Sequence, residues 1–490
     1  MAERTLTAGV ARANITPPVG IHLVGYILRV EPAVGVDQDL YATVLVLADG
    51  RAKVAIVDCD LAVFTVDRAD AVRERIAAAI GTPRSHVLLA CSHTHNGPPT
   101  GIWDFGPTTG PVEQAYVAAL DHYLVGAAVT ADHSRRPARV GAGLGHCDIA
   151  INRIEELPDG TMVLGQNPDG PTDHGVGVVR IDGLDRRPIA AIVNYQAHPV
   201  VLGPEPLLIS PDYPGVVRRV VEQATGATCL YLMGAAGDQM PRTAWTEDQA
   251  AVRRVGGILG HEAAKVFLGI ETRPLETRKR RVRSLAEVLV YEEHEVPGQG
   301  GTLLGAAERR VALPLVPAPN LGEAQRVLEE TTAEVERARQ ADSSARTLHL
   351  GSLELNWARR LVALAESGPT DRTVEASIQA LRLGDIAIVT APGEAFVRMG
   401  LDAKARSPLP HTLYAAYANG VVSYIPTADQ YPKPGQRRLT PDGINFKGTL
   451  LTPLAPECAE LVVNTGVGLL RGLIEEQDQS PGVREEGARS

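Results

Sequence analysis

The sequence predicts a mixed α/β fold, in which a central sheet of mixed strand direction is flanked by helices and carries a helical insertion. Two apolar runs, Tyr41–Leu47 and Lys53–Val57, flank an Asp-Gly turn and predict a β-hairpin. Apolar residues then recur at helical spacing over 67–80, and the apolar run Val87–Cys91 predicts a buried strand. Because hairpins and helices are mixed along the chain, a purely doubly wound parallel sheet does not fit.

The chain is expected to form one domain over 1–475. The charged segments 321–340 and 343–366 are rich in Glu, Arg, Ala and Leu, and they predict two helices inside an insertion that covers about 298–372. Residues 476–490 form a polar tail that we expect to be disordered.

Composition and charge limit the class of protein. The 490 residues carry a formal net charge of −10 without a basic stripe of interleaved aromatics, so we expect no nucleic-acid partner. The one dense basic run, Arg278–Arg281, is expected to be a solvated edge. The 5 cysteines are widely spaced and are expected to be buried and reduced. No secretory signal and no apolar run of about 18 residues is seen, so we expect a cytoplasmic protein without a transmembrane segment.

Two histidines follow the strand Val87–Cys91 directly. In an extended chain, residues two apart point to the same face, so His93 and His95 are expected to project together from the end of the strand. Neutral imidazoles in such an arrangement are metal ligands. The alternative is a pair of histidines that are hydrogen-bonded in a loop.

Other polar residues also end apolar runs, namely His198, Glu394 and Tyr424. Two histidines and a carboxylate from separate strand ends suit a catalytic zinc with an open coordination position. Spacing alone does not bring these residues together in space, and each has a structural alternative: His198 caps a loop, Glu394 begins a helix and Tyr424 is hydrogen-bonded in the core. Asp58 and Asp60 end another strand and leave a second metal site open.

The motif Ser92-His93-Thr94-His95-Asn96-Gly97-Pro98 closely resembles the Thr-His-Thr-His-Ser-Gly-Pro signature of neutral ceramidases. Further segments have counterparts in that family in the same order: Ile151-Asn152-Arg153, Asn194–Pro199, Ser210–Gly215, Pro392–Glu394 and Ser423–Thr427. The chain therefore resembles the catalytic domain of the neutral/alkaline non-lysosomal ceramidase family, without the C-terminal immunoglobulin-like domain of that family.

The resemblance implies one Zn²⁺ per chain, held by His93, His198, Glu394 and Tyr424. It also implies catalytic roles for His95, next to the substrate or the zinc water, and for Tyr424. The substrate contacts that it implies come from Asn96, Asn152, Arg153 and Asp238.

The reaction implied by the resemblance is zinc-dependent hydrolysis of an amide (N-acyl) bond, with a small-molecule or lipid substrate such as ceramide. Zinc lowers the pKa of a bound water to about 7 and polarises the substrate carbonyl. One departure concerns specificity, because Met240 stands where the family has a serine near the scissile amide, and a thioether donates no hydrogen bond.

Three hypotheses follow. The first is a ceramidase-like amidohydrolase acting on linear amides. The second is the same zinc site acting on a different small polar amide, lactam or ester, which the change at Met240 favours. The third is a metal-binding module without catalysis, and the presence of His95 beside all four candidate ligands argues against it.

Overall fold

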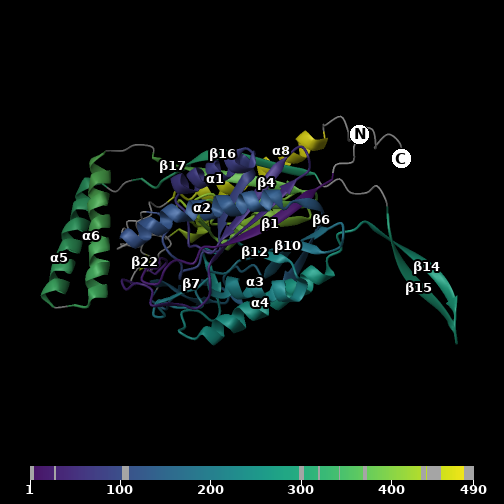
Figure 1. The fold of residues 1–490 in the computed structure, drawn as a ribbon. Coiled ribbons are helices and arrows are strands. Elements are labelled where there is room, and N and C mark those ends of the chain that lie inside the picture. The colour runs from purple at the N-terminus through teal and green to yellow at the C-terminus, as the bar shows by residue number, and fades with distance from the viewer. Residues whose placement is uncertain are drawn as a thin grey trace.

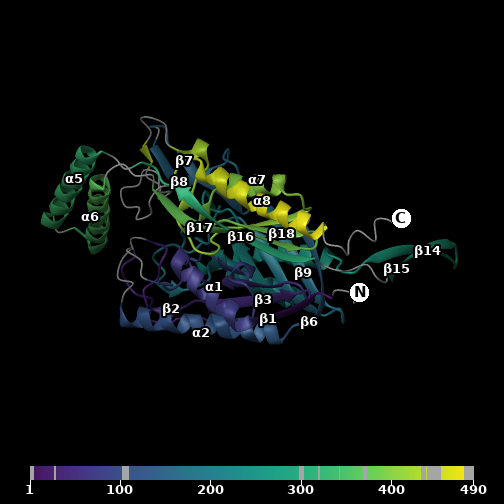
Figure 2. The ribbon, with the colours of Figure 1, turned by 90° about the horizontal axis from the view of Figure 1, so that it is seen from above.

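The chain folds into four layers, in the order helices, large sheet, small sheet, helices. The computed structural model describes most of the chain, and the statements below concern these residues alone: 5–26, 29–101, 110–159, 161–296, 303–317, 320–341, 343–367, 372–431, 437–438 and 454–478. Figures 1 and 2 show the layered body with two projections at its opposite ends.

The strands have the following bounds: β1 Thr7–Asn14, β2 Gly35–Val36, β3 Tyr41–Ala48, β4 Lys53–Cys59, β5 Val87–Cys91, β6 Arg136–His146, β7 Ala150–Glu156, β8 Thr161–Asn167, β9 Gly175–Gly183, β10 Pro188–Tyr195, β11 Leu208–Ile209, β12 Thr228–Met233, β13 Gln239–Pro241, β14 Leu275–Arg283, β15 Glu287–Glu295, β16 Leu304–Pro314, β17 Thr373–Leu383, β18 Ile386–Thr390, β19 Glu394–Ala395, β20 His411–Ala415, β21 Tyr424–Ile425 and β22 Arg437–Arg438. The α-helices are α1 Val66–Ile80, α2 Pro111–His133, α3 Asp212–Thr225, α4 Gln249–Gly269, α5 Leu321–Gln340, α6 Ala345–Glu366, α7 Val397–Arg406 and α8 Cys458–Asp478.

The large sheet has eight strands in the order β12-β10-β9-β6-β1-β3-β4-β5. Its strand directions are mixed, since β4 and β5 are parallel, as are β10 and β12, while the strands between them pair antiparallel. The alternation of side chains along β3 divides the core, because Val44 and Val46 face the layer of helices α1 to α4, whereas Leu45 and Leu47 face the small sheet. The sheet is therefore buried on both faces, which explains its nearly continuous apolar strands.

The small sheet has the order β16-β17-β18-β20, and α8 covers its outer face. The two sheets pack through branched aliphatic residues such as Ile56 and Ile192 from the large sheet and Ile386 and Ile388 from the small one. The predicted fold class, a mixed α/β body with a central mixed sheet and flanking helices, is confirmed. The second sheet packed on the central one was not expected, because the sequence shows buried strands without showing which sheet each joins.

Two hairpins project from the body. The helical hairpin α5–α6 lies within the predicted insertion, although β16, also inside that range, belongs to the small sheet. The strand hairpin β14–β15 projects at the other end of the body.

All 5 cysteines are free and buried, as expected. In the part of the chain that the structure describes, no helix is both long and apolar enough to span a membrane. The predicted polar tail lies outside the described residues from 479 onward.

Candidate functional site

The structure brings His93, His95 and His198 together beyond the ends of β5 and β10. The Nε2 atom of His93 lies 3.1 Å from Nε2 of His198 and 3.3 Å from Nε2 of His95. One ligand atom from each residue fits within a span of 4.8 Å, and all three side chains are buried. We call these three residues the histidine cluster.

The predicted convergence of His93 and His95 is found, but the predicted cause was wrong. Strand β5 ends at Cys91, and His93 has a left-handed backbone with φ 65° instead of an extended one. Its N–H donates to the carbonyl of Leu61, which fixes this turn. The left-handed conformation is costly for a residue with a β-carbon, so its occurrence at the cluster indicates a functional constraint on the position of the imidazole.

Glu394 joins the histidine cluster from the short strand pair β19–β21. Its Oε2 atom lies 3.1 Å from Nε2 of His198 and 3.5 Å from Nε2 of His93. Parallel pairing places Glu394 beside Tyr424. Gly393 permits this close pairing, because a β-carbon there would lie 2.4 Å from the carbonyl oxygen of Ser423.

Two of the three imidazoles have a fixed tautomer. Nδ1 of His93 lies 2.8 Å from the carbonyl oxygen of Ala62, and Nδ1 of His198 lies 2.6 Å from that of Ala236. A carbonyl only accepts, so each Nδ1 carries the proton and each Nε2 presents a lone pair to the cluster. A second ring nitrogen that donates to a backbone carbonyl is the usual support of a metal-binding histidine. His95 differs, since its Nδ1 is buried and has no partner among the described residues.

The charges of the cluster follow from burial. Burial lowers the pKa of His95 well below its ordinary value, and the neighbouring His93 and His198 lower it further. Burial, with Arg153 nearby, lowers the pKa of His198 to about 3. Burial alone would raise the pKa of Glu394, but the facing imidazoles outweigh it and hold that pKa well below its usual range. Glu394 is therefore ionised beside the histidines, and burial favours the neutral forms of His95 and His198.

This donor set fits a zinc ion. Zinc in a tetrahedral site lies about 2.0–2.1 Å from nitrogen and oxygen ligands, which puts ligand atoms about 3.3 Å apart. The three separations among Nε2 of His93, Nε2 of His198 and Oε2 of Glu394 are 3.1, 3.1 and 3.5 Å. A cation that all three atoms bind would balance the buried charge of Glu394.

Two aromatic side chains border the cluster. Tyr417 stacks on His93 with ring centroids 4.0 Å apart, and its hydroxyl donates to Oε2 of Glu394 at 3.4 Å. The hydroxyl of Tyr424 accepts from Nη2 of Arg153 at 3.3 Å. Burial raises the pKa of both phenols above the ordinary value, and Glu394 adds to the rise, so both are neutral in the protein without a metal.

Arg153 places a cation beside the ring of His198. Its Nη2 atom lies 3.4 Å from Nε2 of His198, a long contact, and donates to the carbonyl of Gly237 at 2.7 Å. Its side chain is buried against Tyr424. Of the predicted substrate-contacting residues, Arg153 is the one whose side chain the structure brings to the cluster.

The other three predicted substrate contacts have partners within the scaffold. The Asn152 amide donates to Pro171 and to Oδ2 of Asp238, and its oxygen accepts from the N–H of Ile154. Oδ1 of Asp238 accepts from the N–H of Val397. These bonds hold β7 and β13 against the start of α7, so the two side chains position Arg153, which follows Asn152 in β7.

Asn96 belongs to a brace behind His95. Arg29 donates to the carbonyl of His95 at 2.7 Å, to Oδ1 of Asn96 at 2.8 Å and to the carbonyl of Pro204 at 3.2 Å. The ring of Tyr26 meets His95 edge-on at 5.0 Å. Arg29 thus ties the His95 loop to the loop that follows His198. Arg29, Tyr26 and Tyr417 stand in no motif of the sequence, and only their proximity to the histidine motif in the folded chain identifies them.

Asp58 and Asp60, where a second metal was left open, already have a cation. Nη1 of Arg218 lies 3.3 Å from Asp58, and Nη2 of Arg218 donates to Asp60. The N–H of Tyr231 and the hydroxyl of Ser92 add further hydrogen bonds to the carboxylates. We call this buried group of Asp58, Asp60 and Arg218 the aspartate cluster. It contacts Ser92, the residue before His93, through the hydrogen bond from the Ser92 hydroxyl to Asp60.

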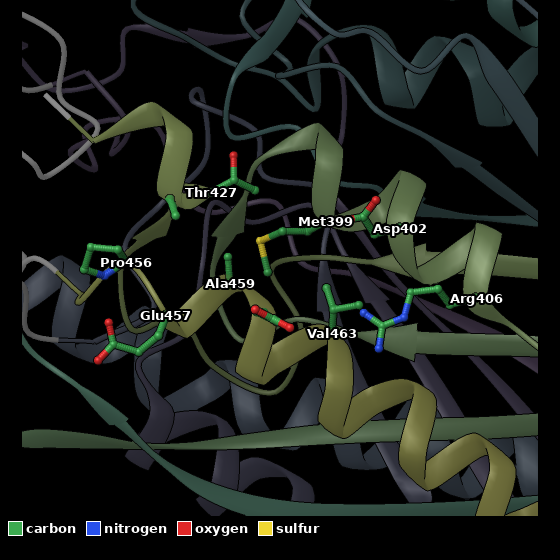
Figure 3. Close-up of a pocket in the computed structure, with 10 residues that line it drawn as sticks. Met399, Asp402, Arg406, Thr427, Pro456, Glu457, Ala459 and Val463 are labelled. Atoms are coloured by element: carbon green, nitrogen blue, oxygen red, sulfur yellow. The ribbon is translucent and has the colours of Figure 1, made fainter. Parts of the chain in front are cut away.

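A cavity of about 510 Å³ lies between α7, the start of α8 and the segment at Thr427 (Figure 3). Its lining combines apolar residues such as Met399 and Val463 with charged ones such as Asp402 and Glu457. None of the histidine cluster, Glu394 or Tyr424 lines it. The cavity therefore lies apart from the point where the candidate ligating groups converge.

Comparison with solved structures shows which fold this is. The structure is similar to neutral ceramidase from Pseudomonas aeruginosa, with a TM-score of 0.65 and 18% sequence identity over 97% of this chain and 75% of that chain. It is also similar to a ceramidase complexed with C2, with a TM-score of 0.63 and 17% identity over 97% of this chain and 76% of that one.

The sequence also matches a family model, described as neutral/alkaline non-lysosomal ceramidase, N-terminal, over residues 6–235. That range includes the whole histidine cluster, whereas Glu394 and Tyr424 come from the part that the fold comparison covers. The expected resemblance to the neutral/alkaline non-lysosomal ceramidase family is confirmed over residues 6–235, and the likeness of fold extends over 97% of the chain.

Proposed function

We propose that this protein is a zinc-dependent hydrolase that cleaves the amide bond of an N-acyl compound. The observation that carries the proposal is the convergence of lone pairs from two carbonyl-anchored histidines and the carboxylate of Glu394 at about zinc-ligand separations. When bound, zinc supplies Lewis acidity and a nucleophilic water at neutral pH.

The tautomers support separate roles for the histidines. His93 and His198, whose Nδ1 protons are held by backbone carbonyls, hold the metal together with Glu394. The unanchored Nδ1 of His95 leaves its ring free to exchange tautomers, which suits a group that holds the substrate carbonyl or passes a proton to the leaving amine.

Tyr424 and Arg153 complete the proposed site. The Tyr424 phenol is the fourth metal ligand or, unligated, a donor to the oxyanion, and its pKa falls once a divalent cation lies beside it. Arg153 holds a fixed positive charge within hydrogen-bonding distance of Tyr424, where negative charge develops during attack on the carbonyl.

The first experiment measures zinc in the purified protein by elemental analysis, without chelators. About one zinc per chain is expected in the wild type and almost none in His93→Ala or His198→Ala. His133→Ala is the matched control, because His133 lies exposed in the last turn of α2. A wild type without any bound metal would overturn the proposal.

The second experiment separates catalysis from metal binding. His95→Ala is expected to keep its zinc and to lower kcat by about 10²–10³-fold, the usual cost of removing one group that stabilises the developing oxyanion. Loss of zinc from this variant would instead make His95 a ligand. The substrates to test are short and long N-acyl amides, ceramide included, followed by esters and lactams.

A second candidate function keeps the same zinc site but changes the substrate to a small polar amide, lactam or ester. The observation that favours it is Met240, which is buried against Ile151 and Val200 and places no hydrogen-bond donor where the family has a serine. Hydrolysis of the polar substrates, with long-chain amides at least about tenfold slower in kcat/KM, would select this candidate.

A further inference from the structure

The strand hairpin β14–β15, which we call the ribbon arm, is almost entirely uncovered. It projects from the body at the end opposite to α5–α6 (Figures 1 and 2). From Glu276 to Leu289 every residue is exposed except Val282, which is half-buried. An ion pair between Arg139 in β6 and Glu295 holds the base of the ribbon arm.

The outer half of the ribbon arm exposes large apolar side chains. The exposed fractions are 107% for Leu285 in the turn and 47% for Val288, while Leu289 at 51% and Tyr291 at 60% lie on the face opposite to Val288. An isolated two-stranded hairpin is at best marginally stable in water, and both of its strands are open edges. A ribbon of this length that carries uncovered apolar residues therefore needs a partner.

The charges of the ribbon arm indicate what the partner is. Strand β14 carries a run of cations from Arg278 to Arg283, whereas β15 carries carboxylates, among them Glu287 and Glu292. Within one ribbon arm Arg280 pairs with Glu292 at 2.7 Å. A partner with a single sign of charge would be attracted to one strand and repelled by the other, but a second ribbon arm offers both signs.

The register makes the ribbon arm self-complementary. On one face Arg278 lies across from Glu292, and Val282 lies across from Val288. Two such faces can stack about a two-fold axis that runs parallel to the strands and lies between the two ribbon arms. Each residue of β14 then lies over a residue of β15 in the other copy, namely the one that is its cross-strand partner within a single ribbon arm. Arg278 then faces Glu292 of the second copy, and the valines of the two copies meet.

We propose that the ribbon arm is a self-association surface, through which two copies of this chain dimerise face to face. The small area and the many charges make the interface a weak, salt-sensitive one. The histidine cluster takes no part in it. Arg29, which braces His95, also donates to the carbonyl of Pro204. The next residue, Glu205, pairs with Arg346 in α6. The site therefore lies toward the end of the body that carries the helical hairpin.

The test is the oligomeric state of the full chain by sedimentation equilibrium and native mass spectrometry. The wild type is expected to dimerise at concentrations on the order of 10 µM. Arg278→Glu and Glu292→Arg each place like charges opposite each other twice in the dimer, which raises the dimer Kd by about tenfold or more. An equimolar mixture of the two variants restores every opposite-charge contact and is expected to form the heterodimer.

A control shows whether the ribbon arm still folds in these variants. The chain that carries both changes, R278E and E292R, loses the ion pairs Arg280–Glu292 and Arg278–Glu276 but restores opposite charges between the two copies, and it is expected to dimerise more tightly than either single variant. Zinc content is expected to stay the same in all variants. A wild type that stays monomeric at about 100 µM overturns the proposal, and so does a mixture that forms no heterodimer.

One outcome would identify a different partner. Monomeric wild type that pellets with vesicles of phosphatidylcholine and phosphatidylserine, and loses this binding when Leu285→Ser and Leu289→Ser are combined, would make the ribbon arm a lipid-docking element. The proposal of self-association would then be overturned.

Discussion

Two groups of buried polar residues lie next to each other beyond β5, and they differ in how their charges are balanced. In the aspartate cluster, both nitrogens of Arg218 contact carboxylates, so the chain supplies its own cation. In the histidine cluster, Glu394 and the imidazole lone pairs converge, and Arg153 makes only a long contact at the rim. A buried group that holds its own cation supports structure, whereas one that lacks a central cation can bind one.

The largest expected effect comes from removal of the internal cation. Arg218→Met leaves two buried carboxyls without their cation, and we expect the free energy of unfolding to fall by about 3–5 kcal/mol. Urea unfolding of the metal-free protein measures it. The matched change, Glu394→Gln, is expected to lower the same quantity by less than Arg218→Met does, while it removes zinc.

The triple variant Asp58→Asn, Asp60→Asn and Arg218→Met serves as the control, since it removes the charges together and is expected to recover much of the loss. If Arg218→Met and Glu394→Gln cost equal stability in the metal-free protein, the contrast between the two clusters fails.

A third buried carboxyl, that of Asp212, sharpens the comparison because it has neither a cation nor a candidate metal. Its oxygens accept from the N–H groups of Leu202 and Tyr213, at 2.9 and 2.6 Å. Burial raises the pKa of Asp212 from 3.8 to about 7. The folded protein therefore holds this proton more tightly than the unfolded chain, and the resulting stability is lost as the pH rises toward and through 7.

We therefore expect Asp212→Asn to flatten the pH dependence of stability. Between pH 5 and pH 8 the free energy of unfolding of the wild type should fall by about 2–3 kcal/mol relative to that of the variant. Urea titrations at several pH values measure this difference. Curves that stay parallel would show that Asp212 is ionised in the folded protein throughout this range.

The smallest expected effect concerns the support of the metal ligands. Tyr417→Phe keeps the ring stacked on His93 but removes the hydroxyl that donates to Glu394. Loss of such a support typically costs 10–100-fold in metal affinity, and at this 3.4 Å distance we expect about tenfold. Competition with a chelator of known affinity measures it.

Tyr414→Phe is the matched control for this prediction. The hydroxyl of Tyr414 is buried without a partner among the described residues, so its removal should leave zinc affinity unchanged. Equal zinc affinities for wild type and Tyr417→Phe would mean that the hydroxyl of Tyr417 does not support Glu394.

Much of the fold could be predicted from the sequence, because apolar runs and helical spacing are local signals. Helix α1 over Val66–Ile80 and the helices of the insertion are examples. The packing of a second sheet on the first could not, since residues such as Leu45 and Ile388 are apolar in any buried strand, and their contact joins distant parts of the chain.

The candidate site shows the same limit. His93, His198 and Glu394 could be named in advance because their residue types and family motifs carry the chemistry. The carbonyls of Ala62 and Ala236, which fix the tautomers, leave no trace in the sequence, because every residue has a carbonyl. Arg218 could not be paired with Asp58 either, since the two are brought together only by the packing of α3 on the sheet.

The pairing of Glu394 with the histidine cluster has a consequence for biosynthesis. Roughly 300 residues separate His93 from Glu394, and at a synthesis rate of about 5–20 residues per second the carboxylate leaves the ribosome roughly 15–60 s after the first imidazole. During that interval the nascent chain contains the histidines but lacks both Glu394 and strand β21, which pairs with the strand that holds Glu394. The order of translation thus delays completion of the site until the C-terminal third of the chain has emerged.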